Sequence, residues 1–252
     1  MNLQEKITNG WEISAKGYSN IVQDDFHSPR REIWTDLILS GAPQKGPMEI
    51  LDVGTGPGVF ATILSLAGHH LIDISPKMLE QAKANSARYG VSPTYLLMNS
   101  QELTFAENSF DMIVSRDVVW IMEHPEEVYA SWLRILKPGG RIVVFDSGHN
   151  KDNFLTKFDH NNEAYREEYR QKFGREPAVS FEQGQYEAAR GWKRELKLTY
   201  ESRPEWDVAA LERLGYKNVC WENVVPQISY SEELRFQNEG KVYFRLCADK
   251  SI

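Results

Sequence analysis

A glycine-rich stretch near residue 50 constrains the fold more than any other part of the chain. Residues 49–61 read Glu-Ile-Leu-Asp-Val-Gly-Thr-Gly-Pro-Gly-Val-Phe-Ala. The apolar residues before the glycines predict a buried strand, and residues 59–67 predict a helix that ends at Gly68. Glycines let a ligand approach the backbone closely, and the start of a helix adds free N–H groups. The stretch therefore predicts a strand, a loop and a helix that together cradle a nucleotide.

The spacing of Gly54, Gly56 and Gly58 indicates which class of nucleotide the loop could bind. A dinucleotide-binding loop has the pattern G-x-G-x-x-G, and Val59 stands where its third glycine belongs. A loop that binds nucleoside triphosphates ends in Gly-Lys-Ser or Gly-Lys-Thr, and this loop has neither the lysine nor the hydroxyl. Pyrophosphate binding and triphosphate hydrolysis are therefore disfavoured. A purely structural turn stays open as the alternative.

Composition narrows the class of protein. The 252 residues are 41% hydrophobic and 26% charged, as in an ordinary globular protein of one domain or of a domain with an insertion. The net charge is −7, and no basic run stands out, so nucleic acid and anionic membrane are disfavoured as main partners. The first ten residues lack the apolar core of a signal peptide, and no apolar run reaches membrane-spanning length. We expect a cytoplasmic protein.

The two cysteines, Cys220 and Cys247, lie in strand-like stretches without other cysteines or histidines at metal-binding spacing. They predict buried free thiols, and neither a disulfide nor a metal site is expected.

Strands and helices alternate beyond the glycine loop. Strands are predicted at residues 71–74, 94–98, 111–115, 141–146, 218–222 and 242–248, with helices between most of them. The last strand would pair antiparallel beside the sixth. This order predicts an α/β protein with a mostly parallel sheet and an antiparallel last strand.

Three motifs, in order along the chain, resemble those of the class I S-adenosylmethionine (SAM)-dependent methyltransferases. They are Asp-Val-Gly-Thr-Gly-Pro-Gly at 52–58, Asp-Ile-Ser-Pro-Lys-Met-Leu at 73–79 and Leu-Lys-Pro-Gly-Gly at 136–140. The run Ser-Arg-Asp-Val-Val-Trp at 115–120 is similar to the branch whose enzymes methylate quinone rings and other small metabolites. The resemblance implies a Rossmann-like sheet of seven strands, SAM as cofactor and S-adenosylhomocysteine (SAH) as product.

The resemblance also implies cofactor-binding residues. Asp73 would accept the ribose hydroxyls, with a helix-capping carboxylate as the alternative, while Ile74 and Met78 would flank the adenine. Asn99 stands where relatives commonly have Asp, and its amide oxygen can still accept a hydrogen bond. Tyr18, in a Trp-x6-Tyr pattern, is a candidate lid residue, with a plain core aromatic as the alternative. The full set is Tyr18, Asp52, Gly54, Gly56, Gly58, Asp73, Ile74, Met78, Asn99, Ser100, Gln101 and Arg116.

No nucleophile or metal is required for the reaction, because the methyl donor carries its own leaving group and the transfer is an in-line displacement. A base would help if the acceptor is a hydroxyl or an amine. The weak candidates are Asp146 and His149 after the fifth strand, and Asp117 and His124 after the fourth. Each has a structural role as its alternative. His69 and His70 would lie at the opposite end of the sheet, so they are discounted as bases.

Four parts are predicted along the chain: an N-terminal helical segment (1–45) that partly covers the cofactor, a SAM-binding core (46–146), a helical cap insertion (147–202) and the rest of the core sheet (203–252). The insertion has aromatic residues at helical spacing, at positions 154, 158, 165, 169 and 173. It would lie over the acceptor site, or else be a surface elaboration or a dimer contact. The link at 68–71 is shorter than is common in the family, so the second strand is expected to be stubby or distorted at its entry.

The leading hypothesis is a SAM-dependent methyltransferase that acts on a small-molecule acceptor, as a monomer or a homodimer. A catalytically silent SAM- or SAH-binding protein, such as a sensor or complex subunit, is the alternative, motivated by the short link, Asn99 and the lack of a clear base. A nicotinamide oxidoreductase rests on fold analogy alone and is weakened by Val59.

Overall fold

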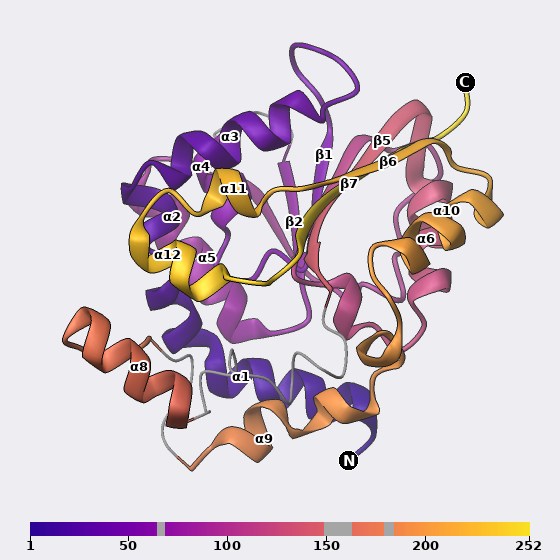
Figure 1. Cartoon of the computed structure of the whole chain (residues 1–252). Coiled ribbons are helices and arrows are strands. Elements are labelled where there is room, and N and C mark those ends of the chain that lie inside the picture. Colours follow the sequence, from indigo (N-terminus) through magenta and orange to yellow (C-terminus); the bar gives the residue numbers. More distant parts are fainter. Residues whose placement is uncertain (65–68, 149–162, 179–183) are drawn as a thin grey trace.

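The sheet has seven strands in the order β3-β2-β1-β4-β5-β7-β6. The structure is a computed structural model, in which residues 1–64, 69–148, 163–178 and 184–252 are described (Figure 1). The strands are β1 (Ile50–Val53), β2 (His69–Asp73), β3 (Thr94–Leu97), β4 (Phe110–Arg116), β5 (Leu136–Ser147), β6 (Lys217–Asn223) and β7 (Tyr243–Asp249). Pairs among β1 to β5 are parallel, and β7 runs antiparallel to both β5 and β6. The predicted fold class is confirmed.

Helices connect the strands and cover both faces of the sheet. They are α1 (Leu3–Ile21), α2 (Asp24–His27), α3 (Arg30–Ser40), α4 (Val59–Leu64), α5 (Pro76–Arg88), α6 (Pro125–Ile135), α8 (Glu163–Phe173), α9 (Tyr186–Arg190), α10 (Glu205–Leu214), α11 (Val225–Ile228) and α12 (Glu232–Asn238), with single turns η1 (Val119–Ile121), η2 (Gly191–Glu195) and η3 (Lys197–Tyr200). Helix α5 begins with a capping residue followed by a proline: the Ser75 side chain accepts the Met78 N–H, and Pro76 is the first residue of the helix.

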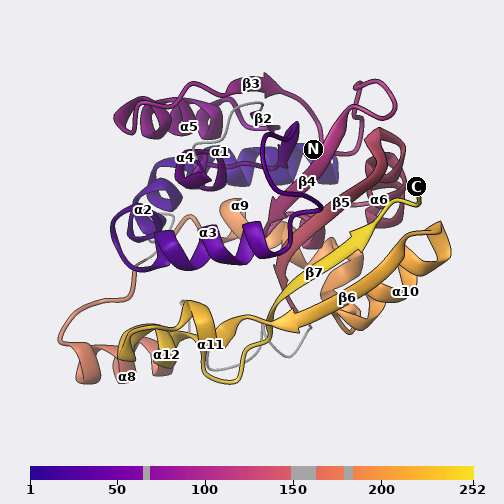
Figure 2. The same cartoon turned by 90° about the horizontal axis from the view of Figure 1, so that it is seen from above.

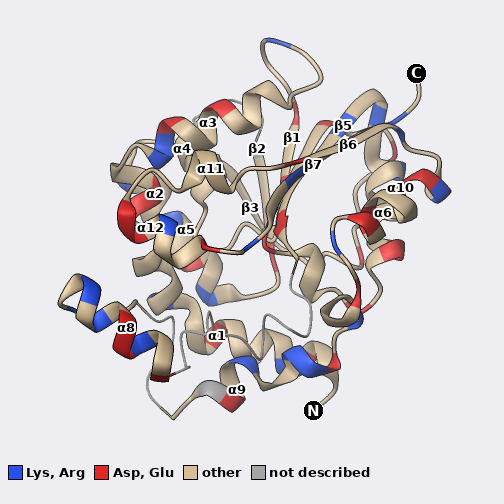
Figure 3. Cartoon of the chain, in the orientation of Figure 1, with Lys and Arg blue, Asp and Glu red and all other residues tan. Residues whose placement is uncertain are grey.

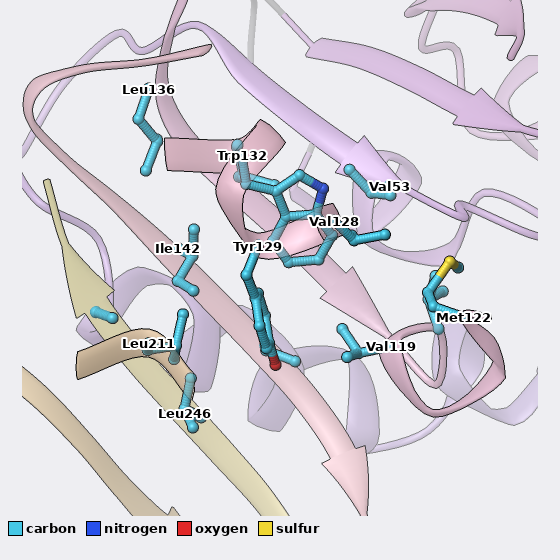
Figure 4. Close-up of a cluster of buried hydrophobic side chains, with 14 of the residues drawn as sticks. Val53, Val119, Met122, Val128, Tyr129, Trp132, Leu136, Ile142, Leu211 and Leu246 are labelled. Carbon is cyan, nitrogen blue, oxygen red and sulfur yellow. The ribbon is translucent and has the colours of Figure 1, made fainter. Parts of the chain in front are cut away.

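The core consists of two apolar layers, one on each face of the sheet. Figure 2 shows the helices that cover these two faces. On one face α3 and α4 contribute Trp34, Ile38 and Phe60. On the other, α6 and α10 pack against β4, β5 and β7; Figure 4 shows Tyr129 and Trp132 of α6 in this layer. Because β1, β4 and β5 are covered on both faces, their residues read as continuous apolar runs rather than as alternating ones.

Helix α1 lies across the carboxyl end of the sheet, between α5 and the pair α9–η2 (Figure 1). Gly10 is the point of closest approach, since a Cβ there would lie 2.5 Å from the Trp192 Nε1 atom. The Arg190 guanidinium stacks over the Trp11 ring at 4.3 Å, and Lys6 pairs with Glu195 at 2.8 Å. The described end of the insertion therefore backs α1 from outside.

The rest of the described insertion packs elsewhere. Tyr165, Tyr169 and Phe173 occupy one side of α8, as their spacing predicts, and form an aromatic cluster with Phe236 of α12. Charges of both signs alternate along α8 (Figure 3), where Arg170 pairs with three glutamates. Positions 154 and 158 lie outside the described residues, and the division of the chain into four parts stays a prediction.

Three details differ from the sequence-based expectations. Cys220 is exposed, because it lies on the edge strand β6, and only Cys247 is buried. Strand β2 is not stubby, since it pairs through four residues with each neighbour; residues 65–68 before it are outside the described part. Strand β5 begins at Leu136, because the Lys-Pro-Gly-Gly turn is absorbed into the strand at a register shift against β4.

Candidate functional site

A cavity with about 790 Å³ of empty space, counting its opening to solvent, lies at the carboxyl end of the parallel strands. The walls come from the ends of β1, β2, β3 and β4 and from α1. Open α/β sheets bind ligands at this edge.

The glycine loop after β1 forms one wall of the cavity, and its three glycines have different structural roles. Gly54 and Gly56 line the cavity with φ of +65° and +53°. A Cβ at Gly54 would lie 2.4 Å from Val118, so this position also allows the loop after β4 to approach. Gly58 faces away from the ligand: its hypothetical Cβ would lie 2.9 Å from the Ala82 Cβ of α5. It serves helix packing, and its predicted role as a cofactor contact stays a prediction.

Asp73 is the last residue of β2, and both of its carboxylate oxygens accept hydrogen bonds from backbone N–H groups. Oδ2 accepts the Gly56 N–H at 2.9 Å, and Oδ1 accepts the Ser75 N–H at 2.9 Å. Burial raises the pKa of Asp73 to about 6, against the opposing effect of these N–H donors. The carboxylate thus braces the glycine loop and the turn into α5, and it also lines the cavity. Both alternatives considered for Asp73, helix-capping group and ligand contact, are compatible with this geometry.

Asp52 is a second buried carboxylate on the cavity wall. Its Oδ2 accepts the Thr55 hydroxyl at 2.8 Å. Burial raises the pKa of Asp52 to about 7, and the Thr55 bond and the Arg116 charge act in the opposite direction. A carboxylate in this environment favours a ligand that carries positive charge.

The wall after β2 and β3 is partly apolar. Ile74, Met78, Asn99 and Ser100 line it, so the structure brings them together as the resemblance implies. Gln101 is not among the lining residues. Its side chain instead joins two neighbouring segments, donating from Nε2 to Gln4 Oε1 at 2.7 Å and accepting the His124 N–H at 3.0 Å.

Arg116, at the end of β4, lines the cavity and is already paired. Its Nη1 donates to Asp25 Oδ2 at 2.8 Å, and its guanidinium lies over the rings of Trp34 and Phe60, 5.3 Å and 5.2 Å from their centres. Arg30 adds a second positive charge, with Nε 3.0 Å from Asp25 Oδ1. Asp25 is not predictable from the sequence, because a polar residue in a weakly helical segment gives no signal of its burial.

Tyr18 and three further residues of α1 form the wall opposite the strand ends. Gln4, Ile7, Trp11 and Tyr18 line the cavity, and their spacing of three, four and seven residues places them on one side of a helix. Burial raises the pKa of Tyr18 to about 12, so its hydroxyl is protonated at neutral pH. The same helical spacing could have identified Gln4, Ile7 and Trp11 from the sequence.

The four candidate bases are in different positions. Asp117 lines the cavity, in the left-handed region with φ of +58°, and accepts a hydrogen bond from the Tyr243 hydroxyl. Burial raises the pKa of Asp117. Asp146 is fully buried in an ion pair with Arg203 at 2.7 Å, and His124 is exposed at the start of α6. His149 lies outside the described residues. Of the three described candidates, only Asp117 reaches the cavity.

The residues around the cavity fit SAM. Asp52 and Asp73 offer buried carboxylates to a ligand with a positively charged amino acid part and ribose hydroxyls. Ile74 and Met78 offer an apolar slot for a base. Across the described ranges, no group of three or more His, Cys, Asp or Glu side chains could hold a metal ion. In the same ranges no helix is both long and apolar enough to cross a bilayer.

The chain is therefore a Rossmann-like α/β protein with a cavity at the carboxyl end of its sheet, where such folds bind their ligands. Residues 51–144 match the family model described as a methyltransferase domain. These residues thus correspond to a SAM-dependent methyltransferase domain, and SAM is the cofactor that this family match supports.

Three relatives illustrate the likeness. An uncharacterized methyltransferase of Mycobacterium tuberculosis is 36% identical over 95 residues, which are 38% of this chain and 37% of the relative. The ubiquinone/menaquinone biosynthesis C-methyltransferase UbiE of Desulfotalea psychrophila is 28% identical over 129 residues, 50% of this chain and 52% of the relative. A solved phosphoethanolamine N-methyltransferase 2 of Haemonchus contortus, in complex with SAM, superposes with a TM-score of 0.66 at 17% identity, over 100% of this chain and 60% of that one. The chain spans about half the length of the curated relatives, or less.

Proposed function

We propose that the protein transfers a methyl group from SAM to a small-molecule acceptor by in-line displacement. The observation that carries the proposal is the composition of the cavity around Asp73. Polar groups suited to the cofactor line it, and so do the apolar residues Ile7, Trp11, Ile121 and Met122. A second small molecule can bind there beside the cofactor, and α1 shields that space from a polymer.

The charges around the cavity favour an uncharged or cationic acceptor. Three lining residues are carboxylates, Asp52, Asp73 and Asp117, while the charge of Arg116 is matched by Asp25. An anionic acceptor would meet no unpaired positive charge among the described lining residues. The apolar wall is also suited to a ring, and the likeness to a quinone C-methyltransferase is consistent with that.

The protein's own contribution would be position, desolvation and, for an acceptor that must lose a proton, a base. SAM supplies an activated methyl group with a neutral thioether as its leaving group. Asp117 is the described carboxylate that would take the proton, since it lines the cavity and its raised pKa makes it a stronger base than an exposed aspartate. Tyr243, which donates a hydrogen bond to Asp117, would hold the carboxylate in place.

Calorimetric titration with SAM and SAH tests the cofactor site. We expect micromolar binding by the parent protein and a loss of at least about ten-fold in Asp73→Ala, because one substitution removes the ribose acceptor and the support of the Gly56 N–H. Asp36→Ala, an exposed aspartate on α3, is the matched control and should bind as the parent does. No binding by the parent would end the proposal.

Turnover of an acceptor panel separates catalysis from silent binding. The panel contains a hydroxylated ring without charge and two analogues of the same ring, one with an amine and one with a carboxylate. We expect the carboxylate analogue to be the poorest substrate. Asp117→Asn should lower kcat about 10²-fold or more while SAH binding stays within a few-fold of the parent. Tight SAH binding without turnover of any acceptor would favour the silent SAM-binding protein instead.

A further inference from the structure

Helix α1 closes the cavity, so something must hold it there when a ligand is bound. Gln4, Ile7, Trp11 and Tyr18 form a continuous wall along this helix. The polar contacts that attach α1 to its neighbours include three in its N-terminal half. Lys6 pairs with Glu195 of the insertion, Glu12 accepts from Ser75 and Lys77 at the start of α5, and Gln4 bonds Gln101.

The contact with Gln101 differs from the other two, because Gln101 belongs to the loop after β3, which is expected to border the adenine of the cofactor. Its backbone N–H donates to Asn99 Oδ1 at 3.0 Å, and Asn99 and Ser100 line the cavity. Its side chain then reaches both Gln4 of α1 and the His124 N–H at the start of α6. One residue therefore joins three of the segments around the cavity: the loop after β3, the loop after β4 and α1.

The direction of these hydrogen bonds is fixed by chemistry. A backbone N–H can only donate, so His124 requires the carbonyl oxygen of the Gln101 amide. The NH₂ group of Gln101 then faces Gln4, which must present its own oxygen. The Gln101 side chain thus donates a hydrogen bond to Gln4 of α1 and accepts one from the His124 N–H at the start of α6.

We propose that Gln101 is a positioning residue that fastens α1 over the cavity by joining it to the loop at Asn99 and to the start of α6. The retention of a bound cofactor then depends on Gln101, although Gln101 itself does not line the cavity. This inference rests on the proposed function for its ligands, but the attachment of α1 by Gln101 does not depend on them.

The first test removes the two hydrogen bonds while keeping the length of the side chain. Gln101→Met should raise amide hydrogen exchange along α1 in the protein without ligand, and should make SAH release about three- to ten-fold faster, as expected for the loss of one or two neutral hydrogen bonds. Lys6→Met is the matched control on the same helix. It breaks an exposed ion pair with the insertion and should leave SAH release within about two-fold of the parent.

The second test uses the direction of the bonds. Gln4→Glu keeps an acceptor for the Gln101 NH₂ group, and in Gln101→Glu the Gln4 amide can turn to donate, so each single variant should release SAH nearly as the parent does. The double variant sets two carboxylates against each other and should behave like Gln101→Met or worse. A general loss of folding would not produce this pattern.

Unchanged exchange along α1 in Gln101→Met would overturn the proposal, whether or not SAH binds. Equal SAH release from the parent and Gln101→Met would overturn it as well. Failure of the parent to bind SAH would instead reject the proposed function, and the exchange measurement would still decide the role of Gln101.

Discussion

Asp52 shows how a single buried carboxylate couples stability to pH. Its pKa is about 7 in the folded protein and 3.8 in the unfolded chain, so between these values the folded state binds more protons. Its contribution to stability is fully present below pH 3.8 and is lost as the pH rises toward 7. The cavity keeps this carboxylate at a cost, as expected of a group retained for a positively charged ligand.

We predict that Asp52→Asn weakens this pH dependence. In the absence of ligand, the free energy of unfolding of the parent should fall between pH 5 and pH 7, and this one group accounts for up to about 1.4 kcal/mol per pH unit. The variant should lose that part of the slope, as measured by urea denaturation at several pH values. Asp111→Asn is the control, because the pKa of Asp111 is lowered and its titration lies below this range. An identical slope in Asp52→Asn and the parent would contradict the assignment.

Other residues show where sequence reasoning succeeded and where it failed. Asp73, Ile74 and Met78 follow a parallel strand in a motif, and parallel strands end at one edge, so their meeting was predictable. Gln101 and Asp146 lie in equally suggestive places, after β3 and in β5. Their partners, Gln4 and Arg203, are 97 and 57 residues away, so no local pattern could reveal them.

At the scale of elements, the packing of α4 and α5 against the glycine loop depends on Gly58. This residue has φ of +75°, and a Cβ would come within 2.9 Å of the Ala82 Cβ and 3.1 Å of its Cα. The contact is with the backbone of a helix, which cannot yield as a flexible side chain can. The third glycine of the loop is thus explained by helix packing.

We predict that Gly58→Ala destabilises the protein more than Gly90→Ala does. Gly90 has a similar φ of +71° and nothing within 4 Å of a hypothetical Cβ, so it isolates the backbone strain of about 1–2 kcal/mol. Overpacking against Ala82 should add about 1–3 kcal/mol at Gly58. Chemical denaturation of both variants gives the difference directly. Equal losses would mean that α5 moves aside at no cost.

Helix α1 was the least predictable element. Its sequence is polar and includes two glycines, at positions 10 and 17, which lower intrinsic helix propensity. The Asn2 capping box begins the helix, and packing against α5 and α9 holds it. Gly10, unfavourable in an isolated helix, is what allows Trp192 to approach.

At the scale of the whole molecule, one buried network ties the end of the insertion to the sheet. Arg203 pairs with Asp146 of β5 and Asp207 of α10, each at 2.7 Å, and all three side chains of these ion pairs are fully buried. Asp207 also accepts the Tyr129 hydroxyl from α6 at 2.7 Å. Asp146 therefore anchors the chain where it returns to the core, which accounts for a carboxylate at the end of β5 without a catalytic role.

Local sequence patterns were enough to predict the order of strands and helices, the glycine loop and the edge of the sheet where the cavity lies. These depend on patterns within a few residues and on the rule that parallel strands end together. The folded structure adds which wall α1 forms, which carboxylates are paired and which segments Gln101 joins. Contacts such as Gln4 with Gln101, or Arg203 with Asp146, join segments far apart in the chain, and their energies depend on burial that exists only once the protein has folded.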